Sequence, residues 1–132
     1  MIKRLNYQNT DTPKQKKHLM KHHKTLTAKL YSTTINRSYY ASFYAIRAIL
    51  ALDGFDAKSH KSAIIYFNKN YIDTDIFPKE LGQKLGQLKT MRESSDYDDF
   101  FVVTIERAEK QLNSAQYILS FIEKYLVAKY EL

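Results

Sequence analysis

The stretch from residue 35 to residue 52 constrains the fold more than any other part of the chain. Its apolar and aromatic side chains fall on nearly every face of a helical wheel, a pattern typical of a helix that is surrounded by its neighbours. We therefore expect a central helix that begins near Thr33 and ends near Asp53. Gly54 suits the position that follows a helix end, because glycine readily adopts a left-handed backbone.

The strongest periodicity lies in residues 101–126, where apolar residues alternate steps of four and three. The members of this seam are Phe101, Ile105, Ala108, Leu112, Ala115, Leu119, Ile122 and Leu126. A helix with such a seam should pack lengthwise against the central helix. Tyr117, Phe121 and Tyr125 widen its apolar face, so it could also touch a second copy of the protein.

Two further helices are expected between these. Ser59 can cap a helix whose core-facing row begins at His60, and Pro78 should lie in the first turn of the next helix. That helix carries its apolar stripe on Leu81, Leu85 and Leu88, with Gly82 and Gly86 allowing a close neighbour. No strand-like alternation competes, so we predict an all-α fold: one domain, an up-and-down bundle of four to five helices.

The basic charge of the chain is concentrated at its N-terminal end. The formal net charge is +7; residues 1–30 carry eight Lys or Arg against the single acid Asp11, and residues 31–132 are neutral overall. We divide the chain into a basic arm with a first helix, 1–30, and a bundle, 31–132. Thr12 and Pro13 predict where the short first helix begins. The arm would attract a phosphate polyanion such as RNA, or it is a solvated helix face.

Several kinds of site and location lack support in the sequence. Cysteine is absent, which excludes disulfides and thiolate metal sites and suits the cytoplasm. No apolar run is long enough to span a membrane, and no secretory signal is recognisable. His18 and His22 have a spacing that could share a metal, but no carboxylate lies in 12–30, so we expect no metal site and no cofactor.

Polar residues on the predicted helices suggest a different chemistry. Arg37 and Arg47 cannot lose their charge, so they need carboxylates, solvent or a ligand; they are either salt-bridged packing residues or the cationic edge of a cleft. Arg92 can pair with Asp96 along its helix. Arg, His and Asp side chains could serve metal-independent RNA cleavage, which needs a base, an acid and a cation.

Three runs of residues resemble the HEPN superfamily (higher eukaryotes and prokaryotes nucleotide-binding). They are Asn-Arg-Ser-Tyr-Tyr-Ala-Ser-Phe-Tyr-Ala at 36–45, Lys-Ser-His at 58–60 and Arg-Glu-Ser-Ser-Asp-Tyr at 92–97. They look most like the small stand-alone prokaryotic members that are often encoded beside a minimal nucleotidyltransferase. The resemblance covers about residue 30 to the C-terminus and leaves the basic arm outside its distinctive part.

The resemblance implies a two-fold homodimer with a cleft where the paired motifs meet. Many HEPN proteins are metal-independent endoribonucleases that act as toxins, and the partner nucleotidyltransferase can serve as antitoxin. In those ribonucleases an Arg is followed, after four to six residues, by a His. Arg92 matches the Arg, but no His follows it, and Asp96 and Tyr97 occupy that window. In some toxins the partner adenylylates a tyrosine near this place.

Three functional hypotheses remain open. The first is a toxin–antitoxin or nucleotidyltransferase-paired module whose cleft binds RNA or nucleotide and could cleave RNA, with Arg92, Asp96 and His60 as catalytic residues. Its binding residues would be Asn36, Arg37, Tyr40, Arg47 and Tyr97. The second is a non-catalytic HEPN scaffold for the nucleotidyltransferase, in which Arg92 and Asp96 form a structural pair. The third is a general nucleic-acid binder that acts through residues 1–30.

Overall fold

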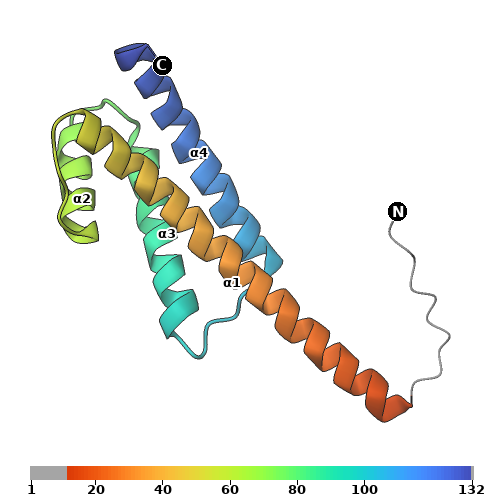
Figure 1. The fold of residues 1–132 in the computed structure, drawn as a ribbon. Coiled ribbons are helices and arrows are strands. Elements are labelled where there is room, and N and C mark those ends of the chain that lie inside the picture. Colours follow the sequence, from red (N-terminus) through yellow and green to blue (C-terminus); the bar gives the residue numbers. More distant parts are fainter. Residues whose placement is uncertain (1–11, 132) are drawn as a thin grey trace.

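The computed structural model describes residues 12–131, which form four α-helices and one π-helical turn (Figure 1). The elements in chain order are α1 (Pro13–Leu52), α2 (His60–Phe67), η1 (Asn68–Ile72), α3 (Lys79–Tyr97) and α4 (Ile105–Tyr130). α4 runs along α1, and α3 packs against both. The all-α class and the bundle are confirmed. Among the described residues, no helix combines the length and apolarity needed to cross a membrane.

One helix replaces the two that were predicted for residues 13–52. The side chains of Thr33 and Thr34 donate hydrogen bonds to the carbonyls of Lys29 and Leu30, at 2.9 and 3.0 Å. Hydroxyls bonded back to the preceding turn continue a helix rather than cap a new one. The predicted break near Thr33 is therefore wrong. Residues 1–11 of the predicted basic arm lie outside the described residues.

The predicted helix ends are mostly confirmed. Thr12 caps α1, and Ser59 caps α2 in a reciprocal pair with Ser62. After α1, Gly54 adopts φ +97°, and the amide of Phe55 donates to the carbonyl of Leu50 at 2.8 Å, as in a Schellman motif. Pro78 is a correction: it has extended backbone angles and precedes α3 instead of lying within its first turn.

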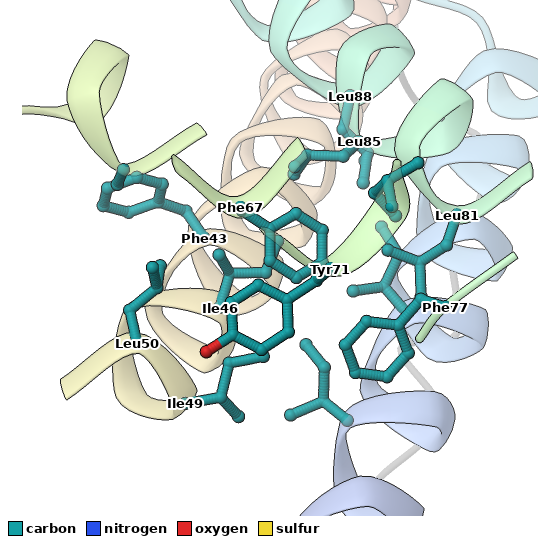
Figure 2. Packing of buried hydrophobic residues seen from close by; sticks show 14 of the residues in the cluster. Phe43, Ile46, Ile49, Leu50, Phe67, Tyr71, Phe77, Leu81, Leu85 and Leu88 are labelled. Carbon is teal, nitrogen blue, oxygen red and sulfur yellow. The ribbon is translucent and has the colours of Figure 1, made fainter. Parts of the chain in front are cut away.

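The core lies where α1, α2, η1, α3 and α4 meet (Figure 2). Its buried members include Phe43, Ile46, Ile49, Leu50, Phe67, Tyr71, Phe77, Leu81, Leu85 and Leu88. Gly82 allows a close neighbour as predicted, because a Cβ there would lie 3.3 Å from Cγ2 of Ile72. The same prediction is wrong for Gly86, which faces open space.

Only half of the predicted seam on α4 faces the core. Ala108, Ala115 and Ile122 are buried, whereas Ile105, Leu112 and Leu119 are between 37% and 45% exposed. The buried arc is completed instead by Gln111, Ser114 and Ile118, and Phe101 lies before the helix begins. The aromatic residues predicted to touch a second copy, Tyr117, Phe121 and Tyr125, pack against the core of the same chain.

Asp53 joins the end of α1 to η1 and to the end of α4. Its carboxylate accepts hydrogen bonds from the hydroxyls of Tyr71, Tyr125 and Tyr130 and from Nζ of Lys129, at 2.6 Å for Tyr125 and Lys129. Burial would raise the pKa of Asp53, but these hydrogen bonds hold it well below its ordinary value. The carboxylate is thus a charged anchor for the far end of the bundle.

Candidate functional site

Arg92 lies on α3 and crosses the faces of two tyrosine rings of α1. Its guanidinium carbon is 5.4 Å from the ring centroid of Tyr39 and 5.0 Å from that of Tyr40, within reach of cation–π attraction. Its Nε is 3.5 Å from Oδ2 of Asp96 and is buried without a hydrogen bond. Two rings and one carboxylate therefore hold a cation whose side chain remains 18% exposed.

Asp96 connects Arg92 to a shallow hollow between α1 and α3. Nδ2 of Asn36 lies 3.5 Å from Oδ2 of Asp96, and the hydroxyls of Ser32 and Ser95 are 2.9 Å apart. The hollow has a volume of about 240 Å³ and is lined by Lys29, Ser32, Thr33, Asn36, Arg37 and Asp96. Two cations and one carboxylate line this hollow, so its wall keeps one excess positive charge for a small anionic group.

His60 is the first residue of α2, and its ring is held among aromatic side chains of α1. The ring stacks on Phe43 with centroids 4.0 Å apart, and Tyr40 meets it edge-on at 5.9 Å. Nδ1 lies 3.2 Å from the hydroxyl of Tyr39. Because Tyr39 and Tyr40 also contact Arg92, the same two tyrosines link His60 to the arginine.

Positive charge surrounds His60. Burial lowers the pKa of its imidazole, and the nearby cations Arg92, Arg47 and Lys89 lower it further. The imidazole is therefore neutral at neutral pH, with one nitrogen free to accept a proton. A neutral histidine beside several fixed cations is a suitable arrangement for a base that acts next to a phosphate.

The structure brings five of the eight predicted site residues together. Asn36, Tyr40, His60, Arg92 and Asp96 form one continuous group across α1, α2 and α3. The five residues are therefore close in space, and their chemical roles stay predictions.

The other three predicted residues lie around that group. Arg47 places Nη2 3.4 Å from the carbonyl of Ala57, and Arg37 lines the hollow. Both arginines are exposed. Neither forms an ion pair among the described residues, so the alternative of salt-bridged packing residues is wrong. The outer face of α1 is therefore open rather than buried. Tyr97 ends α3 and is 74% exposed.

Three residues at or near the site were missed as site residues. Tyr39 and Phe43 belong to the run 36–45 but were not predicted as site residues, yet they hold the ring of His60. Lys89 lies one helical turn before Arg92, and that spacing could have identified it. No group of three His, Asp or Glu side chains in 12–131 is placed to hold a metal ion.

Comparison with known proteins adds to this geometry. The family model for the HEPN domain matches residues 16–125. The chain belongs to the HEPN family. The match extends into the first half of α1, which the sequence motifs had left outside the resemblance.

Curated relatives of this HEPN protein are between 28% and 32% identical to it over the aligned residues. A Methanocaldococcus jannaschii protein named "Putative toxin MJ0142" is 28% identical over 102 residues, 77% of this chain and 69% of that protein. A UPF0332 protein of Thermotoga maritima is 29% identical over 94 residues, 71% of each chain. A UPF0332 protein of Gloeobacter violaceus is 32% identical over 68 residues, 52% of this chain and 54% of that protein. No solved structure matches the chain.

Proposed function

We propose that this HEPN protein is the RNA-cleaving, toxin-like component of a module that includes a minimal nucleotidyltransferase as its antitoxin. It acts as a homodimer, and the site around Arg92 binds RNA or nucleotide phosphate. The HEPN family membership and the toxin name of the Methanocaldococcus relative support this proposal.

The proposal depends on one observation, the ring of His60 that packs on Tyr40 and Phe43 and is linked to Arg92 through Tyr39 and Tyr40. In the proposed reaction His60 takes the proton of a ribose 2′-hydroxyl, and the 2′-oxygen forms a bond to the adjacent phosphorus. The bond from phosphorus to the 5′-oxygen breaks, and that oxygen takes a proton from water. Arg92 stabilises the charge that builds on the phosphoryl oxygens.

The remaining site residues have supporting roles. Asp96 stays with Arg92 and Asn36 and orients them, so His60 is the preferred base, with Asp96 as the alternative. Arg37 and Arg47 hold the RNA backbone, together with those lysines of the first half of α1 that do not lie beside Leu19, Leu26 and Leu30. Tyr40 and the exposed Tyr97 contact a base or ribose.

The central prediction concerns Arg92. Arg92→Ala should abolish cleavage of total cellular RNA by the purified protein in the presence of EDTA, because the phosphorane charge loses its cation. A loss of at least about a hundredfold is expected, as for removal of an oxyanion donor. His60→Gln should show a similar loss, whereas Asp96→Asn should retain partial activity.

Arg107→Ala is the matched control for this experiment. Arg107 also lies over an aromatic ring, that of Phe101 at 4.7 Å, but it is outside the site. Its loss removes the same charge and the same kind of contact. Equal activity of wild type and folded Arg92→Ala, or equal losses in the two arginine variants, would refute the proposed role.

A second candidate is the non-catalytic scaffold. It is favoured by the absence of a histidine after Arg92 and by the ion pair that Arg92 already forms with Asp96. This candidate predicts that the protein co-purifies with the nucleotidyltransferase encoded beside it, and that the free protein leaves RNA intact. It also predicts that Arg92→Ala lowers stability instead of activity.

The general nucleic-acid binder is the third candidate. It predicts an affinity for RNA that falls steeply with salt and is lost when the lysines of the first half of α1 are replaced.

A further inference from the structure

The first half of α1 extends beyond the bundle (Figure 1). It carries three exposed leucines, Leu19, Leu26 and Leu30, which are between 49% and 66% exposed. Their spacing of seven and four places them on one side of the helix. The exposed Tyr44 continues the same line in the second half of α1, so this side faces away from the bundle.

A second apolar stripe lies on the outer flank of α4. Ile105, Leu112 and Leu119 recur every seven residues and are all exposed. α4 contacts α3 on its other flank, where the hydroxyl of Tyr117 bonds Glu80 and Lys84 lies over the tyrosine ring. The stripe is thus the half of the heptad seam that residues 12–131 leave exposed. Heptad stripes of this kind commonly pack against another helix.

The two stripes have opposite charge. Residues 12–30 contain six lysines and no carboxylate, and Lys16 lies one helical turn before Leu19. On α4 the residues beside the stripe include Glu109 and Glu123, both exposed. A basic leucine stripe and an acidic one suit each other, whereas a polyanion would leave the leucines uncovered.

We propose that the basic stripe of α1 (Leu19, Leu26, Leu30) binds the acidic stripe of α4 (Ile105, Leu112, Leu119) in a second copy of the chain. The helices run antiparallel, with Leu19 against Leu119 and Leu26 against Leu112. That register brings Lys16 within one residue of the position opposite Glu123, where the two charges can pair.

Two-fold symmetry uses both stripes of both copies. A two-fold axis makes each contact occur twice. If α1 of one copy contacts α4 of the other, then α4 of the first copy also contacts α1 of the second. The α1 extension of each copy therefore covers α4 of its partner, and no stripe is left open. This inference rests on the homodimer of the proposed function and identifies its interface.

Disulfide cross-linking tests the contact directly, because the natural chain has no cysteine. Leu26→Cys and Leu112→Cys are purified separately, mixed and oxidised, so that a bond between positions 26 and 112 joins two chains. We expect a cross-linked dimer whose peptide map contains this bond. Ile65→Cys, on the exposed surface of α2 at 57% exposure, replaces Leu26→Cys in the control mixture and should give little product.

Charge reversal tests the register. Lys16→Glu and Glu123→Lys should each weaken the dimer at least tenfold by sedimentation, and the double variant should recover most of the loss. Both positions are exposed, so circular dichroism should show unchanged helix content.

Several outcomes would overturn the inference without deciding whether RNA is cleaved. A full chain that stays monomeric at high concentration would do so. So would a dimer that forms the control disulfide as readily as the 26–112 bond, or one that survives both single charge reversals. RNA cleavage is measured separately, so failure of the interface and failure of the ribonuclease proposal remain distinguishable.

Discussion

At the scale of single residues, the site is organised around cations that cannot be neutralised. Arg92 lies on the rings of Tyr39 and Tyr40, and a guanidinium keeps its charge at any physiological pH. Its field, together with burial, keeps His60 neutral. One fixed cation and one neutral base are therefore prepared before any ligand binds.

The lowered pKa of His60 predicts a pH dependence of stability. The unfolded chain binds a proton at His60 near its ordinary pKa, about 6.5, whereas the folded chain binds it only at lower pH. The free energy of unfolding therefore keeps the full contribution of His60 above about pH 6.5. It loses this contribution as the pH falls below that value. In the variant His60→Gln, the melting temperature should depend less on pH between about pH 7 and pH 5.

Thermal melts followed by circular dichroism measure this effect. The difference between wild type and His60→Gln isolates His60 from the chain's other histidines. Parallel melting curves of the two proteins across this pH range would contradict the prediction.

At the scale of elements, α1 is one continuous helix whose parts make different contacts along its length. Its middle carries the site, and its C-terminal end is fixed by the Schellman motif and by Asp53. The four donors on Asp53 come from η1 and α4. One carboxylate thus holds the last turns of α4 against the end of α1.

Asp53→Ala should lower the free energy of unfolding by about 2 kcal/mol, because the hydroxyl of the buried Tyr71 and the partly buried hydroxyls of Tyr125 and Tyr130 lose their charged acceptor. Chemical denaturation followed by circular dichroism measures the change. Asp56→Ala is the matched control, since Asp56 is exposed and should change stability by under about 0.5 kcal/mol.

The depressed pKa of Asp53 adds a second expectation. Its stabilisation is present above the unfolded pKa of about 3.9 and is lost as pH falls below that value. Wild type should therefore lose more stability than Asp53→Ala on acidification. Equal stability of Asp53→Ala and Asp56→Ala at neutral pH would show that the network contributes little.

At the scale of the whole molecule, α1 is half inside and half outside the bundle (Figure 1). Backbone amides open most readily where few apolar contacts hold a segment. In the monomer, amides of residues 13–30 should therefore exchange with solvent much faster than those of residues 35–50.

Hydrogen exchange at increasing protein concentration tests this difference and the proposed dimer together. Protection of residues 13–30 and of the outer face of α4 should rise with concentration, while protection of α2 stays constant. Protection that is independent of concentration over the range in which the dimer forms would mean that the α1 extension does not bind the partner.

Much of the fold and part of the site could be predicted from the sequence. The caps at Thr12 and Ser59 and the motif at Gly54 are local, because each depends on hydrogen bonds to residues a few positions away. The break at Thr33 was mispredicted because a threonine can cap a helix or bond back within one, and the sequence does not decide between them. The place of His60 beside Arg92 was only a conditional expectation.

The sequence by itself determined that this chain is helical, where α1 begins and ends, where α2 begins, and which family the chain resembles, because periodicity and capping act over one or two turns. Only the tertiary structure decided which half of the α4 seam is buried and that Tyr39 and Tyr40 connect His60 to Arg92. The heptad pattern of α4 shows that both halves of the seam are apolar. The neighbouring helices of the same chain cover only one half. Which half they cover depends on how α1, α3 and α4 share a single core.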